Sequence, residues 1–349
     1  MKKIVYYMPK IMIENSSEDA KNFLKLVGKN ASAIDRTGSF LLPFDTHIIW
    51  QLPAQIDDGD SHAMFYFEML NRARTLMQSG RPLVLFYSGG LDSTGLLVAF
   101  NYLIQSEGFS RDQITIATSI DAMYENPLCW WEVMLKFNIV DVHDCLNNID
   151  FNQSYYIMGE NADQLFGSDK MFQLPRIASM LLHGELNTEN LTTYIHSINI
   201  TPSDSFMSSL HLLISKAPFK IQKMSDLLWW INFTCKWQSV SLRTLCFTKT
   251  FNSGLEISPH QLRSFETFYN TPKFQQISML KSFARFSENP NDNSYKFALR
   301  VFIEKMHPSW HEYLAVKTKV GSLYNIVRRR HYEIQKMFWD DTTSLYSAS

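Results

Sequence analysis

Cysteine is scarce in this sequence, and the few cysteines show no pairing pattern. Cys129, Cys145, Cys235 and Cys246 form no Cys-x-x-Cys motif and have no spacing typical of a zinc site. This pattern predicts reduced thiols rather than the disulfide framework of a secreted protein. A long apolar run is missing as well, because the opening Met-Lys-Lys leads into only a short apolar stretch. The sequence therefore predicts a soluble, cytoplasmic protein that does not associate with a membrane.

The chain also lacks an excess of charge of either sign. Its 33 basic and 34 acidic residues give a formal net charge of −1, so electrostatic attraction to nucleic acid is not expected and nucleic acid is an unlikely partner. Hydrophobic residues make up 45% of the 349 positions, which is enough for a substantial core. The length predicts one large domain or two closely associated ones.

The most informative stretch is residues 83–94, which read Leu-Val-Leu-Phe-Tyr-Ser-Gly-Gly-Leu-Asp-Ser-Thr. Its apolar beginning predicts a buried strand, and the apolar residues that follow it predict a buried helix. Glycines between them allow a tight turn that leads directly into the helix N-terminus. Such a turn is an anion site, because unpaired N–H groups and the helix dipole both favour negative charge. The groups available there are the backbone of Gly89 and Gly90, the hydroxyls of Ser88, Ser93 and Thr94, and the carboxylate of Asp92.

A carboxylate beside an anion site needs an explanation. Asp92 would repel a phosphate unless a cation lay between them, which points to Mg²⁺ and a nucleotide polyphosphate. An ordinary glycine turn before a capped helix is the alternative, since short glycine motifs are common.

A second strand, turn and helix follow at residues 155–167. The apolar run of residues 155–158 ends in Gly-Glu-Asn-Ala-Asp-Gln-Leu-Phe-Gly. Taken alone, Glu160 and Asp163 could be acidic groups at a helix N-terminus. Asp92 and Asp163 could instead hold one Mg²⁺ between neighbouring strand ends, because ligands bind at the carboxyl ends of parallel strands.

These two segments resemble the signatures of a known superfamily. Ser-Gly-Gly-Leu-Asp-Ser resembles the pyrophosphate (PP) loop of the ATP pyrophosphatases, and residues 159–167 resemble the Gly-x-Gly-Ala-Asp-Glu-Leu-Phe-Gly signature of their asparagine synthetase branch. The resemblance implies an α/β fold with a HUP-like parallel sheet, helices on both of its faces and a largely helical C-terminal part. It divides the chain into a short N-terminal extension (1–63) and a synthetase-like domain (64–349). Within that domain the nucleotide-binding core is about 81–170 and the helical substrate side about 171–349.

The resemblance also implies roles for individual residues. Asp92 and Asp163 match the carboxylates that hold magnesium, and Glu160 matches a glutamate that receives or orients the incoming nitrogen nucleophile. A basic segment near the C-terminus matches one whose lysine reaches the phosphates; Lys319 is the first choice and Lys317 the alternative, although both could be surface lysines. The remaining matches bind ATP or pyrophosphate: Leu85, Ser88, Gly89, Gly90, Ser93, Thr94, Thr118, Ser119 and Gly159.

Several positions depart from the family pattern. Asn161 stands where the family has Gly, and Gln164 stands where it has Glu. Because Asn tolerates the left-handed backbone, the turn at 161 is expected to survive. The family's substrate segment, Glu-x-Arg-x-Pro-Phe-Leu-Asp, has no legible counterpart near residues 265–276, whereas residues 295–300 resemble its Lys-x-x-Leu-Arg segment. The departures bear on the acyl substrate more than on ATP.

Glutamine-dependent members of the family begin with a catalytic cysteine at position 2, but residue 2 here is Lys. Residues 1–63 are also too few for a glutaminase domain. We therefore expect the nitrogen to come from ammonia, from an amine substrate or from a separate donor protein.

The predicted function is an ATP-dependent, Mg²⁺-requiring ligase that adenylates a small-molecule carboxylate and transfers the acyl group to ammonia or an amine. The alternatives are another PP-loop reaction, such as modification of a nucleic-acid base, or a non-catalytic nucleotide-binding protein that keeps the fold. The aromatic stretch around Trp229 is expected to be core or a wall that keeps water from the adenylate.

Overall fold

The computed structural model describes residues 3–14, 16–28, 32–167, 184–245, 256–283, 285, 296–316 and 336–340. At its centre is a five-stranded sheet in the order β4-β3-β2-β5-β7, in which every pairing is parallel. The strands are β2 (Leu83–Tyr87), β3 (Ile114–Thr118), β4 (Asn138–Asp141), β5 (Tyr155–Met158) and β7 (Phe265–Thr267). The structure thus confirms an α/β protein with a parallel sheet, which is compatible with a Rossmann-like or HUP-like fold.

The sheet buries both faces, as the apolar runs of its strands predict. Leu85 of β2 and Ile157 of β5 belong to one hydrophobic cluster, which also contains apolar residues of α3 (Ser61–Gln78) and α4 (Leu91–Glu107). Phe86 and Met158, one position further along, belong to a second cluster on the other face. This alternation follows from the two-residue period of side chains along a strand.

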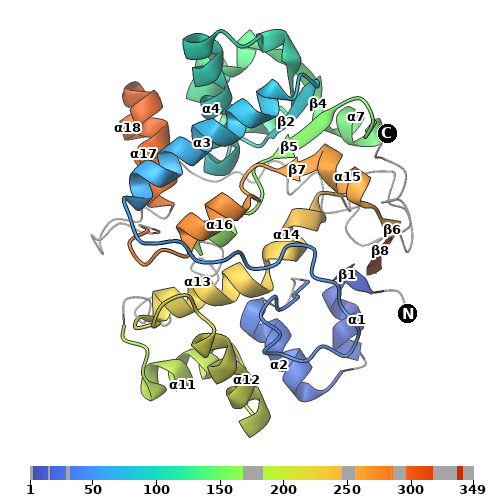
Figure 1. The fold of residues 1–349 in the computed structure, drawn as a ribbon, viewed down its shortest axis with the longest axis vertical. Coiled ribbons are helices and arrows are strands. Elements are labelled where there is room, and N and C mark those ends of the chain that lie inside the picture. Colours follow the sequence, from blue (N-terminus) through green and yellow to red (C-terminus); the bar gives the residue numbers. More distant parts are fainter. Residues whose placement is uncertain are drawn as a thin grey trace.

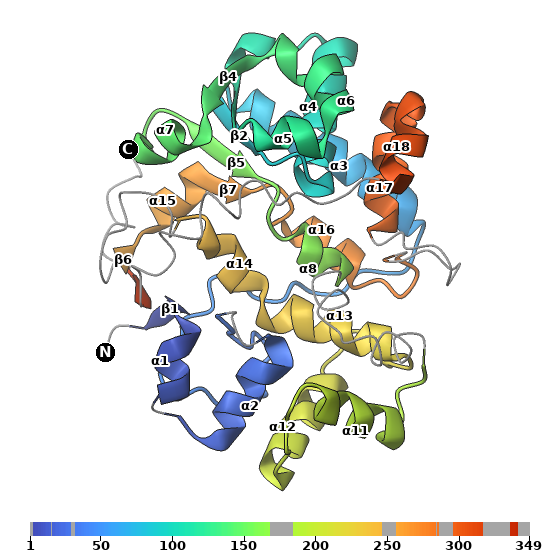
Figure 2. The same cartoon turned by 180° about the vertical axis from the view of Figure 1, so that it is seen from behind.

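Helices cover the sheet on both sides. Helices α3 and α4 pack against each other, with α3 in front of the strands in Figure 1 and behind them in Figure 2, and α17 packs along α4. Helices α7 and α15 contact the strands from the second cluster's side. The helices that carry or frame the candidate site are α3 (Ser61–Gln78), α4 (Leu91–Glu107), α5 (Asp121–Glu125), α6 (Pro127–Glu132), α7 (Val142–Asn147), α8 (Ala162–Phe166), α14 (Trp237–Arg243), α15 (Pro259–Ser264), α16 (Pro272–Ser278) and α17 (Phe297–Met306).

The strand order places a topological switch point beside β2. From β2 the chain moves outward through β3 and β4 on one side, and then returns to pair β5 on the other side of β2. In open parallel sheets, ligands bind in the crevice at the carboxyl ends of the strands where the order reverses. The loops after β2 and β5, which carry the two sequence signatures, meet at this point.

The N-terminal residues are integrated into the molecule. Strand β1 (Ile4–Tyr7) pairs antiparallel with β8 (Lys336–Trp339), which also pairs with β6 (Glu256–Ile257). Helix α2 (Glu18–Val27), capped by Ser17, packs on α12 (Asp204–Ser215) and α13 (Met224–Cys235). These helices, with α1 (Pro9–Glu14) and α11 (Thr188–Ser197), form the lower half of Figure 1. The N-terminal segment therefore lies against α12 and α13.

Two further points concern the extent of the fold. The predicted nucleotide core ends near residue 170, but the sheet gains its edge strand, β7, from residues 265–267. In the part of the chain that the structure describes, no helix combines the length and the apolar character needed to cross a bilayer.

Candidate functional site

The loop after β2 is a tight turn closed by its own hydroxyls. Gly89 has a φ of +78°, and a Cβ atom there would lie 2.8 Å from the carbonyl oxygen of Ala122, so only glycine fits. The Ser88 N–H donates to Oγ of Ser93 (3.2 Å), and the Gly90 N–H donates to Oγ of Ser88 (3.2 Å). Helix α4 begins directly after Gly90, so its N-terminal turn lies at the carboxyl end of the central strand.

Three residues predicted to bind ATP are placed in the interior instead. Thr94 is fully buried, and its hydroxyl accepts a hydrogen bond from Nδ2 of Asn126 (3.1 Å). Thr118 donates its hydroxyl to the carbonyl of Tyr87 (2.8 Å), which ties β3 to β2. Leu85 is a mid-strand residue of the main hydrophobic cluster. Their side chains therefore pack into the interior beneath the loop.

Ser119 behaves differently from its neighbour. It follows the last residue of β3, and its hydroxyl oxygen is buried with no hydrogen-bond partner among the described residues. A buried hydroxyl without a partner is costly, and ordered water or a ligand is the usual remedy. Ser119 therefore lies at the carboxyl end of β3 with an unused hydroxyl, and its role at a nucleotide stays a prediction.

The loop after β5 lies against the first loop. A Cβ atom on Gly159 would come within 3.0 Å of the carbonyl carbon of Asp92 and the amide nitrogen of Ser93, so this glycine permits the close approach. Asn161 has a φ of +70°, as its tolerance of left-handed backbone predicts. Its side chain donates to the carbonyl of Trp237 (3.0 Å) and accepts from Oγ of Ser241 (2.9 Å).

The two predicted metal carboxylates converge on one cation, Lys296. The ammonium nitrogen lies 2.5 and 2.6 Å from the two carboxylate oxygens of Asp92 and 2.7 Å from Oδ1 of Asp163. Asp92 comes from the first turn of α4, Asp163 from the first turn of α8, and Lys296 from the residue before α17. Three segments far apart in the sequence thus meet at one point.

This arrangement fits Mg²⁺. Carboxylate oxygens are its preferred protein ligands, and one or two of them commonly suffice when substrate phosphates and water complete the octahedron. Both carboxylates already contact a single positive centre, so a cation between them is compatible with the backbone as it stands. Within the described ranges, no group of three or more His, Cys, Asp or Glu side chains is placed to share a metal ion. Asp92 and Asp163 are therefore the residues that would hold the metal, with the polyphosphate as its other partner.

Glu160 is held by the C-terminal end of α14. Its carboxylate accepts hydrogen bonds from Nη2 of Arg243 (2.6 Å) and Oγ1 of Thr244 (3.3 Å). The Glu160 side chain is 22% exposed, so it is partly accessible from solvent. The cationic partner keeps the carboxylate in one orientation at the mouth of the second loop.

Tyr269 joins the end of β7 to the first loop. Its hydroxyl donates to the carbonyl of Asp92 (2.9 Å), and its ring is fully buried. Burial, with the Asp92 charge as a smaller contribution, raises the pKa of the Tyr269 hydroxyl well above its ordinary value. The phenol therefore stays protonated and acts as a fixed donor to the backbone of α4.

Trp229 and Gln164 are both deeply buried. Trp229 is fully buried, and its indole N–H donates to the carbonyl of Leu165 (3.1 Å), so it is core and not a wall of the site. Gln164 is 1% exposed, and its Oε1 has no partner among the described residues. A Glu at this position would place a charge in the interior, which explains physically why a neutral amide stands here.

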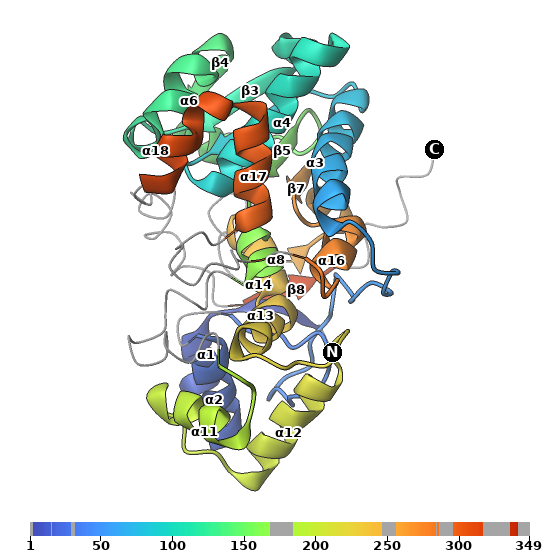
Figure 3. The ribbon, with the colours of Figure 1, turned by 90° about the vertical axis from the view of Figure 1, so that its left-hand side faces the viewer.

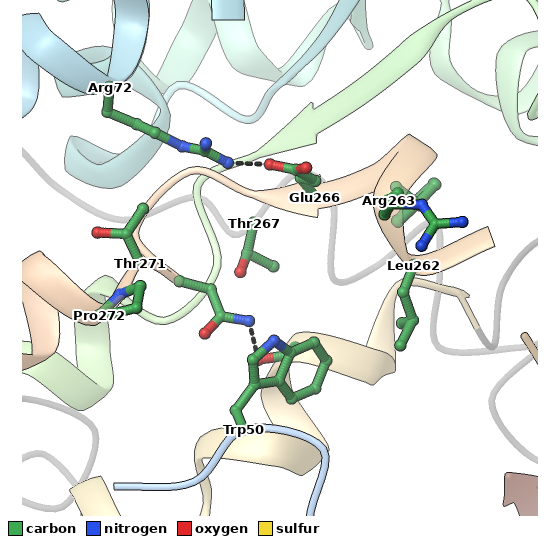
Figure 4. A pocket seen from close by; sticks show the side chains of 11 residues that line it. Trp50, Arg72, Leu262, Arg263, Glu266, Thr267, Thr271 and Pro272 are labelled. Carbon is green, nitrogen blue, oxygen red and sulfur yellow. Dashed lines mark hydrogen bonds and ion pairs between the residues drawn. The ribbon is translucent and has the colours of Figure 1, made fainter. Parts of the chain in front are cut away.

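A separate pocket of about 310 Å³ lies beside β7. Figure 4 shows the ion pair of Arg72 and Glu266 on one side of it and Trp50 on the other. Thr267 points into the space between them, and its buried hydroxyl oxygen has no partner in the described part of the chain. Ser241 lines the pocket and also donates to Asn161, so one hydrogen bond connects the pocket to the loop after β5.

The basic residues near the two loops include two that sequence reasoning did not assign. Lys317 and Lys319, predicted to reach the phosphates, lie outside the described residues. The cation that the structure brings to the site is Lys296, which lies in the Lys-x-x-Leu-Arg-like segment but had no predicted role. Arg243, the partner of Glu160, carries no motif that could have indicated it.

Comparisons with known proteins add no family assignment. No protein-family model matches the chain, and no curated protein matches it. The functional conclusion therefore has to come from the residues and their geometry.

Proposed function

We propose that this protein is an ATP-dependent ligase that adenylates a carboxylate, releases pyrophosphate, and transfers the acyl group to ammonia or an amine. The observation that carries the proposal is the convergence of Asp92 and Asp163 on one cation beside a glycine turn. The turn supplies anion-binding N–H groups and the carboxylates supply metal ligands, and a Mg·polyphosphate needs both.

The first loop is suited to hold the pyrophosphate part of ATP. Helix α4 begins directly after Gly90, so its N-terminal turn offers backbone N–H groups and the positive end of the helix dipole to an anion. Charge builds up on the pyrophosphate as the bond between the α- and β-phosphates breaks. Donors fixed in advance around that charge stabilise the transition state more than the ground state. A magnesium ion bound by Asp92 and Asp163 would add charge stabilisation there.

Glu160 is placed to act on the second half-reaction. It is at the second loop, next to the strand end where the adenylate would form, and Arg243 and Thr244 fix its orientation. A fixed carboxylate can accept a hydrogen bond from an incoming amine and hold it near the acyl carbon, which is a proximity effect.

The pocket beside β7 offers a place for the second substrate. It combines an ion pair, a half-buried indole and a buried hydroxyl. Ser241, which lines the pocket, donates a hydrogen bond to Asn161 of the second loop. Its volume of about 310 Å³ is at the lower end of the range for ligand pockets, so it suits a small polar molecule. We place the acyl or amine substrate there.

The test is ATP–pyrophosphate exchange with labelled pyrophosphate over a panel of amino acids and other carboxylates. We expect exchange that requires one carboxylate, is lost in Asp92→Asn, and is retained in Asp112→Asn, which removes an exposed carboxylate outside the site. Circular dichroism of each variant checks that the fold is intact.

Two other functions give different results in the same assay. A non-catalytic nucleotide-binding protein binds Mg·ATP but shows no exchange with any acid or amine, and that result would refute the ligase proposal. A ligase that binds its amine first shows exchange only after candidate amines are added. A base-modifying enzyme would show exchange only when nucleic acid is present. The balanced charge of the chain disfavours this alternative, because it provides no attraction to nucleic acid.

A further inference from the structure

Lys296 lies where the metal ion of the proposed site belongs. Its ammonium contacts both Asp92 and Asp163, and its side chain is only 6% exposed, compared with 24% and 36% for the two carboxylates. The cation is therefore the most deeply buried member of the cluster. Figure 3 shows the helix that it precedes, α17, running beside α4 with one end at α8.

The local structure at Lys296 is unfavourable for a lysine in two ways. Its φ of +58° is left-handed, which costs a residue with a side chain roughly 1–2 kcal/mol. It is also the N-cap of α17, where its side chain makes no capping hydrogen bond and its charge faces the positive end of the helix dipole. Local helix formation therefore does not explain this residue, and the contacts with the two carboxylates do.

We propose that Lys296 is the resident cation of the nucleotide-free site, and that a divalent metal arriving with the nucleotide displaces its ammonium from between Asp92 and Asp163. This inference deepens the proposed function and rests on it for the identity of the arriving cation. An ammonium and a metal ion cannot share the position, because like charges at contact distance repel strongly.

The displacement has a consequence for the order of binding. A metal ion alone must break an ion pair that is already made and leave a buried ammonium without its partners, which is costly. A metal that arrives on a polyphosphate brings new anionic groups for the displaced lysine. Lys296 thus makes metal binding depend on the nucleotide, and it couples the position of α17 to the state of the site.

The test measures Mn²⁺ binding to the nucleotide-free protein at fixed pH, by electron paramagnetic resonance. We expect the wild type to bind Mn²⁺ weakly and Lys296→Met to bind it at least about tenfold more tightly, a change of about 1.4 kcal/mol. Adding Asp92→Asn to Lys296→Met should remove the gain. Lys305→Met is the matched control, because this exposed lysine is on the same helix, over the ring of Tyr66.

A conservative variant separates this role from a structural one. Lys296→Arg keeps a positive charge between the carboxylates and should bind Mn²⁺ as weakly as the wild type. Lys296→Gln, which keeps a hydrogen-bond donor but no charge, replaces the Met variant if circular dichroism shows that Met prevents folding.

The proposal is overturned if Lys296→Met and Lys296→Gln bind Mn²⁺ no more tightly than the nucleotide-free wild type does. No nucleotide is present in this measurement, so a failure of ATP–pyrophosphate exchange does not affect it. Exchange with an unchanged Mn²⁺ affinity would overturn the role of Lys296 alone and leave the ligase proposal standing.

Discussion

Asn161 shows how a single residue adapts the second loop. It has a left-handed backbone, like a glycine at the same kind of turn, but its side chain also bonds to Trp237 and Ser241 on α14. An asparagine at this position therefore gives the chain an additional link between the loop and α14.

This link predicts the order of stability among substitutions of Asn161. Asn161→Ala loses both side-chain bonds and keeps the strained backbone, so we expect a loss of about 2–4 kcal/mol in the free energy of unfolding. Asn161→Gly relieves the backbone and should lose about 1–2 kcal/mol less. Urea unfolding followed by circular dichroism measures both values.

A second left-handed asparagine serves as the control for that experiment. Asn199 has a φ of +58° and an exposed side chain, so Asn199→Ala should show only the backbone cost, about 1 kcal/mol. Equal losses in the Ala variants of Asn161 and Asn199 would show that the bonds to α14 contribute nothing to stability.

At the scale of residues, the sequence allows site residues to be predicted where they lie in local motifs, and gives no signal for those that lie outside them. Asp92 and Asp163 each follow a strand and a glycine, so their meeting at neighbouring strand ends could be inferred. Lys296 is separated from Asp92 by 204 positions, and no local pattern connects them. Thr94 and Thr118 lie inside the predicted motifs, but the direction of a hydroxyl depends on packing that a motif does not contain.

At the scale of elements, short apolar runs were sufficient to predict two of the inner strands. The runs at residues 83–87 and 155–158 are strands with the predicted bounds. Strand β7 was not predicted because it is three residues long and its middle residue is Glu266, so it has little propensity of its own. Its pairing with β5 comes from tertiary contacts, which also create the pocket at the sheet edge.

The packing of α17 on α4 depends on a glycine within α4. A Cβ atom on Gly95 would lie 2.4 Å from Cδ1 of Leu299 and 3.1 Å from the hydroxyl oxygen of Tyr269. Ala is favoured over Gly in a helix interior by roughly 0.5–1 kcal/mol, so any destabilisation by Gly95→Ala reports the contact between the helices. Gly95→Val adds two more methyl groups and should lose about 1–3 kcal/mol.

We expect Gly95→Val to weaken Mg·ATP binding as well, because α17 begins directly after Lys296 and α4 carries Asp92. Leu299→Ala creates the space that the new side chain needs, so the combination of Gly95→Val with Leu299→Ala should be more stable than the sum of the single losses predicts. Urea unfolding and calorimetric titration with Mg·ATP measure the two effects. Additive losses would show that the helices do not meet at Gly95.

At the scale of the whole molecule, Arg36 joins the N-terminal residues to the rest of the protein. It is 5% exposed, and it donates to the carbonyl of Phe233 (2.6 Å) and to Oε1 of Gln275 (2.7 Å). Its guanidinium also lies over the rings of Phe233 and Trp237. Burial lowers the pKa of Arg36 to about 9, so its hydrogen bonds and ring contacts have to offset the cost of burying the charge. The sequence could not show that Arg36 is buried, because a lone arginine in a polar stretch is usually a surface residue.

Removing Arg36 should therefore destabilise the entire chain and not only its first residues. Arg36→Met keeps much of the side-chain volume but leaves the Phe233 carbonyl and Gln275 without their donor, so we expect a loss of about 2–4 kcal/mol in a single urea transition. Arg74→Met, which breaks a surface ion pair with Glu107, should lose much less because solvent screens the pair. The hydrogen bonds that Arg36 shares with α13 and α16 require these parts to unfold together. Two urea transitions in Arg36→Met, with ATP–pyrophosphate exchange unchanged after the first, would instead show that residues 1–63 are an independent extension.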